Sequence, residues 1–127
     1  MILFSRLKIL ALFLAIAAGL CEECIFRKFL MDGLQRSGKS AVIQIIASAL
    51  LFGIVHGIWG TFRGSIWAAV GATLATGALG FSLAFVYVVS HRNVAPAIFS
   101  HFLINAFVEP GLVLAAVRGE MGRTKGQ

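Results

Sequence analysis

Four apolar stretches, each long enough for a membrane-spanning helix, constrain the fold of this 127-residue chain more than any other feature. They lie near 3–34, 40–59, 65–90 and 94–117. A helix that crosses a hydrocarbon core of about 30 Å needs roughly 20 residues. The chain is 59% hydrophobic and only 13% charged, far more apolar than an ordinary soluble domain. The sequence therefore predicts an all-α fold, a polytopic transmembrane helical bundle of about four spans.

The links between these stretches are short and rich in turn-forming residues. They are centred on 37–39, 60–64 and 91–93. Short links place consecutive helices side by side and antiparallel in one bundle. We therefore expect a single transmembrane domain over residues 1–127, in which 119–127 form a polar tail.

The first stretch has a second interpretation. Two basic residues, Arg6 and Lys8, precede an apolar run and the small residues 17–19, a pattern that resembles a secretory signal peptide. Because strong hydrophobicity continues in every later stretch, we favour an uncleaved first span.

The net charge of +6 does not indicate a nucleic-acid-binding protein. The basic residues stand at the ends of the apolar stretches and do not form one patch, which is typical of anchors to lipid headgroups. The lipid bilayer, and not nucleic acid, is the partner that we expect from this charge distribution.

Three short polar motifs interrupt the apolar stretches. They are Glu22-Glu23-Cys24-Ile25-Phe26-Arg27, Phe52-Gly53-Ile54-Val55-His56 and His101-Phe102-Leu103-Ile104-Asn105. A charged side chain at mid-bilayer costs a few kcal/mol, so such residues normally face a protein interior or a wet cavity and have a function there. The joint presence of the three motifs predicts chemistry inside the membrane.

Helical spacing places the polar residues of each motif near one another. Glu23 and Arg27 are four residues apart and are therefore neighbours on one face. Glu22 points about 100° away, so it can face a cavity while Arg27 holds Glu23. His101 and Asn105 have the same four-residue relation and can both donate hydrogen bonds to one oxygen.

His56 comes from a different stretch, and Phe52, one turn earlier on the same face, can wall the site with an aromatic ring. The set contains the groups that hydrolyse a peptide bond. Glu22, with His56, would take a proton from water, and His101 with Asn105 would stabilise the oxyanion. Counted from the nearer links at 1.5 Å per residue, the two histidines differ in depth by roughly 15 Å. Tilted or staggered helices would have to close that gap.

The three motifs, in this order and at these separations, resemble the CPBP family, also called the ABI or type II CAAX prenyl endopeptidase family of glutamic intramembrane proteases. The family pattern is a Glu-Glu pair followed by Arg, then Phe with His four residues on, then His with Asn or Asp four residues on. All three parts are complete, and the resemblance covers about 14–107. It implies the helical core of that family's fold.

The resemblance also implies an assignment of site residues and a substrate class. The catalytic residues would be Glu22, His56, His101 and Asn105, and the supporting residues would be Glu23, Arg27 and Phe52. The enzyme would be an intramembrane endopeptidase that uses glutamate-activated water. Its substrate would be a membrane-tethered or lipid-modified protein with a CAAX-like or C-terminal sorting tail. We expect a multi-pass protein of a prokaryotic inner membrane.

The mechanism that the resemblance implies is free of metal, so no cofactor is expected. Zinc is the alternative, with Glu22, His56 and His101 as ligands, since two imidazoles and a carboxylate can hold a catalytic zinc. Cys21 and Cys24 lack the second pair of a structural zinc site, and we interpret them as small buried residues.

The chain departs from the family pattern at two points. Lys28 follows the motif arginine where many members carry glycine, and typical members have additional helices before the Glu-Glu pair. Missing helices would leave one wall of the cavity open. We therefore consider a homo-oligomer or a partner membrane protein as a further expectation.

Two other classes of function stay open. One is a non-catalytic family member that acts as a membrane scaffold or partner protein. The other is a haem-binding, metal-binding or proton-relay membrane protein that uses His56 and His101. The second class leaves the Glu-Glu-Arg and His-Asn spacings unexplained, so the protease is the preferred interpretation.

Overall fold

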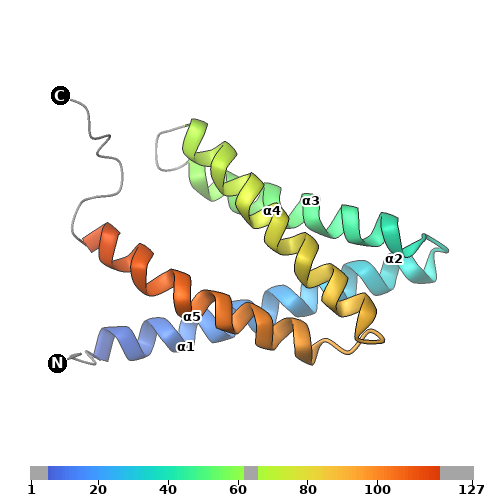
Figure 1. Ribbon diagram of the computed structural model, residues 1–127, viewed down its shortest axis with the longest axis horizontal. Helices are drawn as coiled ribbons and strands as arrows, with labels where there is room; N and C mark the ends of the chain where they lie inside the picture. The colour runs from blue at the N-terminus through green and yellow to red at the C-terminus, as the bar shows by residue number, and fades with distance from the viewer. Residues whose placement is uncertain (1–5, 62–65, 118–127) are drawn as a thin grey trace.

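The computed structural model describes residues 6–61 and 66–117, and within them the chain is helical with short links (Figure 1). Its elements are α1 (Arg6–Glu23), the π-helix η1 (Cys24–Met31), α2 (Asp32–Arg36), α3 (Ala41–Thr61), α4 (Ile66–Val89) and α5 (Ala95–Val117). The first three follow one another directly and form one long helix. The all-α prediction is confirmed. The start of the first expected span, part of the 60–64 link and the polar tail lie outside the described residues.

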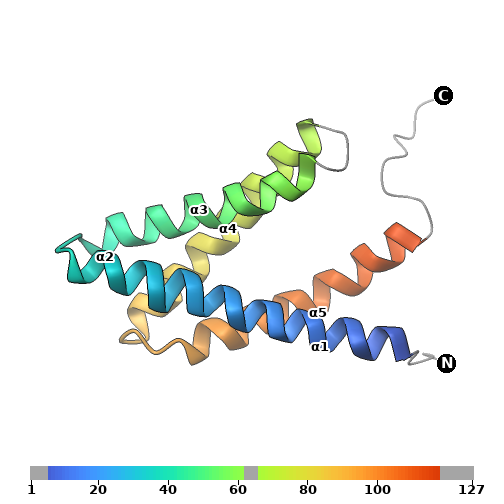
Figure 2. The ribbon, with the colours of Figure 1, turned by 180° about the vertical axis from the view of Figure 1, so that it is seen from behind.

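The helices form two antiparallel pairs that diverge from one end of the molecule, as the two opposite views show (Figures 1 and 2). α3 packs along α4, and α1 packs along α5. The pairs are joined where η1 contacts α3 and where α4 contacts α5. We call the end that carries α2 the closed end. This arrangement places the middle of the long first helix between α3 and α5.

Glycines allow α3 and α4 to lie very close together. A Cβ atom on Gly53 would lie 2.6 Å from the carbonyl oxygen of Thr73 and 3.1 Å from Cα of Gly77. A Cβ atom on Gly57, one turn later, would overlap the Thr73 hydroxyl. Small residues at four-residue spacing commonly let the backbones of two membrane helices approach closely. Because backbone atoms of α4 fill the space beside Gly53, α3 can keep this position only with glycine there.

The first link at the closed end is a glycine-terminated helix end. Gly38, at φ 74°, donates its amide to the Gln35 carbonyl over 2.9 Å, and Lys39 donates to the Leu34 carbonyl over 3.0 Å. This pair of bonds is the Schellman motif, in which glycine is favoured because its φ is positive. Ser40 then accepts a hydrogen bond from the Ile43 amide and caps the N-terminus of α3, which begins at Ala41.

The link between α4 and α5, also at the closed end, repeats the Schellman motif without glycine. His91 donates to the Val88 carbonyl over 3.2 Å and Arg92 donates to the Tyr87 carbonyl over 3.0 Å. His91 and Arg92 have φ values of 53° and 63°. Left-handed backbone at residues other than glycine costs on the order of 1–3 kcal/mol each, so the surrounding contacts must offset it.

Those contacts form a polar group, the closed-end cluster, made of Lys28, Asp32, Gln44, Tyr87 and Arg92. Arg92 donates to Asp32 Oδ1 from Nε over 2.9 Å and from Nη2 over 2.6 Å, and from Nη1 to Gln44 over 3.0 Å. Tyr87 donates to the same carboxylate over 2.7 Å, and the Lys28 ammonium lies 3.1 Å from Asp32 Oδ2. The cluster ties α2, α3 and α4 together. Lys28, a departure from the family pattern, is one of its members.

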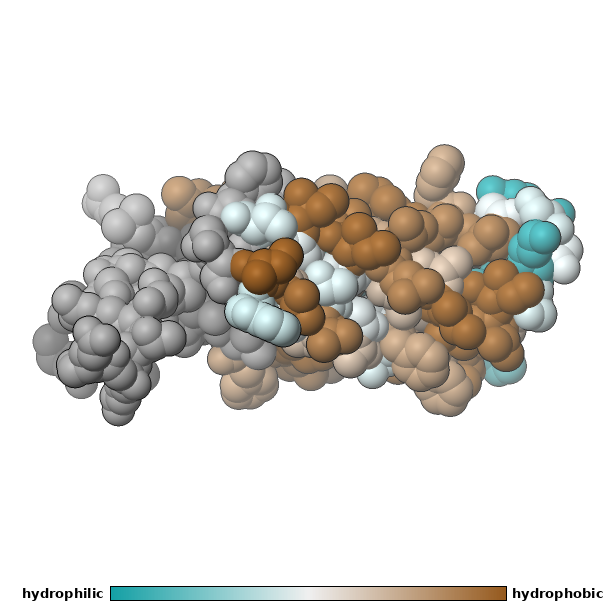
Figure 3. Space-filling view, turned by 90° about the horizontal axis from the view of Figure 1, so that it is seen from above, coloured by the Kyte–Doolittle hydropathy of each residue, from teal (hydrophilic) through white to brown (hydrophobic). Residues whose placement is uncertain are grey.

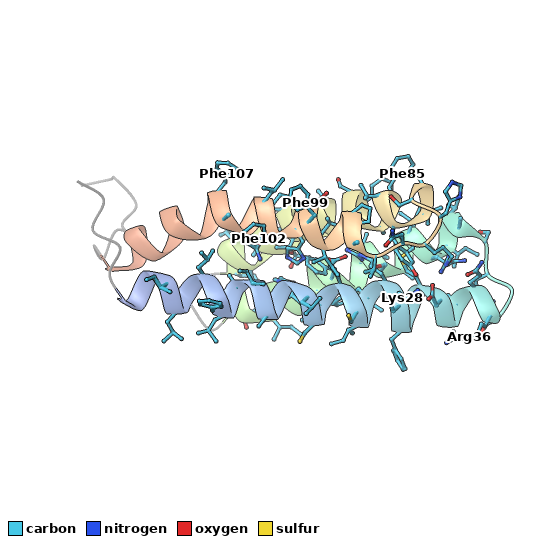
Figure 4. All side chains as sticks on the ribbon, turned by 90° about the horizontal axis from the view of Figure 1, so that it is seen from below. Lys28, Arg36, Phe85, Phe99, Phe102 and Phe107 are labelled. Carbon is cyan, nitrogen blue, oxygen red and sulfur yellow. The ribbon has the colours of Figure 1, made fainter. Side chains whose placement is uncertain are left out.

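The outer surface is largely apolar. Figure 3 shows hydrophobic residues over the middle of the molecule and hydrophilic residues gathered at the closed end. Phe99 and Phe107 project outward from α5 and are 62% and 83% exposed (Figure 4). Among the described residues, two helices are long and apolar enough to cross a membrane, over Ala41–Ile58 and Ala69–Val89, and a shorter apolar stretch covers Ala95–Phe107. An exposed apolar surface of this extent fits contact with lipid.

Candidate active site

A buried ion pair lies where α1 passes into η1. Arg27 Nε donates to Glu23 Oε2 over 2.8 Å, and its Nη2 lies 3.4 Å from Oε1. Both side chains are fully buried. The predicted pairing of the two residues is confirmed. The π-helical turn that follows Glu23 is a feature often found at functional sites.

Glu23 also orients His101 across the α1–α5 contact. His101 Nδ1 lies 2.9 Å from Glu23 Oε1, and the imidazole is almost completely buried. Because an ionised carboxylate can only accept, Nδ1 must carry a proton. In the neutral ring, Nε2 is then an acceptor, and it points away from Glu23.

His56 is oriented by its own helix. Its Nδ1 lies 2.8 Å from the backbone oxygen of Phe52, which again requires a proton on Nδ1. The Phe52 ring stacks on the imidazole, with centroids 4.4 Å apart and planes inclined by 28°. The same ring makes edge contacts with Phe26 at 5.0 Å and His101 at 5.9 Å. Phe52 therefore walls the site, as the sequence predicts.

The two imidazoles face one oxygen of Glu22. Glu22 Oε2 lies 3.6 Å from His101 Nε2 and 3.8 Å from His56 Nε2. These distances exceed a hydrogen bond, so neither imidazole is directly hydrogen-bonded to Glu22. Glu22 and His56 are 29% and 28% exposed. The geometry brings together three acceptor atoms that a water molecule can reach.

The expected depth difference between the histidines is absent from the folded protein. His56 is the sixteenth residue of α3 and His101 the seventh of α5, yet both lie within 3.8 Å of Glu22 Oε2. Figure 1 shows the reason, since α5 begins further from the closed end than α3 does. The stagger of α5 closes the gap of roughly 15 Å that residue counting gives.

Asn105 lies beside His101, where α5 meets α1. A Cβ atom on Gly19 would lie 3.8 Å from Asn105 Nδ2 and 3.7 Å from His101 Cγ. These are ordinary packing distances to both side chains of the third motif. Asn105 is half-buried, so its amide can bind an oxygen atom at this end of the site.

Ser48 is a member of the site that the sequence analysis missed. Arg27 Nη1 donates a short hydrogen bond to the Ser48 hydroxyl, which is fully buried in α3. Ser48 precedes Phe52 by four residues and His56 by eight, so helical spacing places it on the same face. This spacing is the feature of the sequence from which Ser48 could have been assigned to the site.

The structure corrects the interpretation of the two cysteines. Cys21 and Cys24 are both exposed, not buried. Both cysteines point away from the inner face, which Glu23 and Arg27 occupy. Within residues 6–61 and 66–117, no three His, Cys, Asp or Glu side chains are grouped so that they could hold a metal ion. The zinc alternative stays a prediction that chelation can test.

A family model described as type II CAAX prenyl endopeptidase Rce1-like matches residues 4–107. The comparisons with curated proteins and with solved structures found no match. The matched region contains all three polar motifs and covers well over half of the chain. Its description names an endopeptidase, which is the class of enzyme that the three motifs predict. The chain therefore belongs to the Rce1-like family of type II CAAX prenyl endopeptidases.

Proposed function

We propose that this protein is an intramembrane endopeptidase that hydrolyses a peptide bond of a membrane-tethered or lipid-modified protein with water activated by Glu22. One observation carries the proposal: Glu22 Oε2 faces the Nε2 atoms of His56 and His101 at 3.8 and 3.6 Å, with both rings held by hydrogen bonds at Nδ1. The family supports endopeptidase chemistry, and its description supports a CAAX-like tail as the substrate.

The first step is the activation of water. A water molecule beside Glu22 donates one O–H to the Glu22 carboxylate and the other to His56 Nε2, which leaves His101 Nε2 for the oxyanion. Glu22 takes a proton while the water oxygen forms a bond to the carbonyl carbon of the scissile peptide. The π electrons of the carbonyl move to its oxygen, which becomes an oxyanion.

The oxyanion needs donors, and two are within the same part of the site. Asn105 donates from its amide, and His101 donates from Nε2 when its ring carries both protons. Glu23 accepts from Nδ1 in either form and serves as the counter-ion.

The second step releases the products. The carbonyl forms again, the C–N bond breaks, and the proton held by Glu22 passes to the leaving amine. Glu22 returns to its ionised form, and a new water molecule can enter through the exposed side of Glu22 and His56.

The surroundings of the site support a substrate that arrives from the membrane. The polar groups lie between helices whose outer faces are apolar (Figure 3). We propose four spans near the predicted stretches, in a single multi-pass domain of a prokaryotic inner membrane. We also propose that a second copy of the chain or a partner membrane protein packs against this bundle in the membrane.

A cleavage assay in lipid vesicles tests this function. The substrates are a panel of membrane-tethered peptides, some with a lipid-modified cysteine near the C-terminus. We expect wild type to cleave members of the panel and Glu22→Gln to be slower by about 10²–10⁴-fold, which is the range for loss of a general base.

The same assay separates the alternatives. Cleavage that survives a chelator supports the metal-free mechanism, whereas cleavage that a chelator abolishes and zinc restores would favour the zinc site. Equal rates for wild type and Glu22→Gln would overturn the assignment of the base. Failure of folded wild type to cleave any member of the panel would favour the scaffold function.

A further inference from the structure

We infer that Ser48 is a positioning residue of this site, which holds the His101 imidazole in place through Arg27 and Glu23. The inference rests on the proposed function and deepens it. Ser48 does not touch Glu22 or either Nε2 atom in the contacts described above. Its effect on the reaction would therefore be indirect.

The contacts form a continuous buried chain from α3 to α5. The Ser48 hydroxyl accepts from Arg27 Nη1, Arg27 Nε donates to Glu23 Oε2, and Glu23 Oε1 accepts from His101 Nδ1. His101 then presents Nε2 to Glu22 at 3.6 Å. All four members of the chain are less than 5% exposed. Each bond fixes the orientation of the next side chain.

The guanidinium of Arg27 is the element that depends on Ser48. Nε and Nη2 point to Glu23, so the Ser48 hydroxyl is what anchors the Nη1 side of the group. The guanidinium carbon lies 5.7 Å from the centroid of the Phe52 ring, which contacts it without accepting a conventional hydrogen bond. Without the hydroxyl, Nη1 would be a buried charged donor that lacks this acceptor, and Arg27 would have to turn to replace it.

Other hydroxyls in the helices show that this use of Ser48 is unusual for the fold. Thr76 and Ser82 in α4 donate to carbonyls four residues earlier, Ala72 and Ala78, over 2.7 and 3.0 Å. Such bonds remain within one helix and only satisfy the hydroxyl itself. Ser48 instead accepts from another helix. It also couples α3, which carries His56, to the residues that orient His101.

The experiment compares Ser48→Ala, Ser48→Thr and the matched control Ser82→Ala in the full chain in lipid. It measures kcat and KM on a peptide that wild type cleaves, and the ¹⁵N shifts of the His101 ring, which report its tautomer. We expect Ser48→Ala to lower kcat by about 10- to 100-fold with little change in KM, the range for loss of a residue that orients a reacting group. The His101 ring should no longer hold the Nδ1–H form alone.

Ser48→Thr keeps the hydroxyl and should recover most of kcat and the wild-type shifts, whereas Ser82→Ala should match wild type in both. If Ser48→Ala does not fold, Ser48→Cys replaces it. Its side chain is close to serine in size but its sulfur is a weaker acceptor, so kcat and the His101 shifts should change in the same direction but by less. Wild-type kcat and unchanged His101 shifts in a folded Ser48 variant without the hydroxyl would overturn the inference. If wild type cleaves nothing, the proposed function fails, while the ring shifts still decide whether Ser48 orients His101.

Discussion

Two polar clusters lie along the same long helix, and they differ in how completely their acceptors are paired. At the closed end, the Asp32 carboxylate accepts from Tyr87 and Arg92 and is paired with Lys28. In the active site, Glu22 faces two imidazole Nε2 atoms at 3.6 and 3.8 Å, beyond hydrogen-bond distance. Among the described residues, the Asp32 carboxylate is hydrogen-bonded within the protein, whereas Glu22 is partly exposed and lies where a water molecule can reach it.

The difference shows why a buried charge is by itself a poor guide to function. Both clusters combine carboxylates with basic side chains between helices, and both lie in an apolar molecule. The closed-end cluster stabilises a strained link, at which Arg92 has a φ of 63°. The candidate active site also contains a fully buried pair, Glu23 with Arg27, and Glu23 orients His101.

The largest effect on stability should follow from removal of Arg27. Arg27→Met leaves the Glu23 carboxylate buried without its cation, and loss of one partner of a buried ion pair costs about 3–5 kcal/mol. Arg92→Met removes a cation that is partly exposed and should cost about 1.5–3 kcal/mol, the range for a hydrogen bond to a charged group. Unfolding of both variants in detergent measures the difference. A smaller effect of Arg27→Met than of Arg92→Met would contradict the burial argument.

An intermediate effect should follow from a change beneath Phe52. A Cβ atom on Gly80 would lie 2.9 Å from Phe52 Cβ and 3.1 Å from its Cγ, so Gly80→Ala must move the ring that stacks on His56. We expect a loss of about 1–3 kcal/mol in stability from overpacking, together with slower cleavage. Gly71→Ala is the matched control in α4, because nothing lies within 4 Å of its added Cβ. Equal cleavage by the two variants would show that the position of Phe52 does not matter.

The smallest effect should follow from loss of the Tyr87 hydroxyl. Tyr87→Phe removes the hydrogen bond to Asp32 and the one that Lys28 Nζ donates to the hydroxyl, but it leaves those of Arg92. We therefore expect a loss of about 1.5 kcal/mol, the low end of the range for a hydrogen bond to a charged group. Chemical unfolding measures the loss, and cleavage by the folded variant should equal that of wild type. Slower cleavage at unchanged stability would mean that the closed-end cluster also takes part in the reaction.

Local relations in the site were predictable from the sequence. The pairing of Glu23 with Arg27 and the wall formed by Phe52 beside His56 both follow from four-residue spacing on a helix. Because Glu23 and Arg27 point inward, Cys24 between them points outward. It is therefore exposed and not buried as predicted. The catalytic roles of the site residues stay predictions.

Relations between helices were not predictable in the same way. The depth of His101 depends on where α5 begins, which a link with left-handed His91 and Arg92 sets. The sequence carries no glycine at this helix end, so the usual signal for a Schellman motif is missing. The closed-end cluster joins residues up to 60 positions apart, and its members form no short motif. Ser48 could have been included from its spacing, but only the contact with Arg27 shows what it does.

The most direct test of the account compares two isosteric carboxylate substitutions, Glu22→Gln and Asp32→Asn, for cleavage rate and for stability in the same lipid. We predict that Glu22→Gln loses cleavage and keeps the stability of wild type, because its carboxylate lies beyond hydrogen-bond distance of both imidazoles and is partly exposed. Asp32→Asn should lose about 1.5–3 kcal/mol of stability and cleave at close to the wild-type rate while folded. Retained cleavage by Glu22→Gln, or its loss in folded Asp32→Asn alone, would contradict the assignment of the reaction to Glu22.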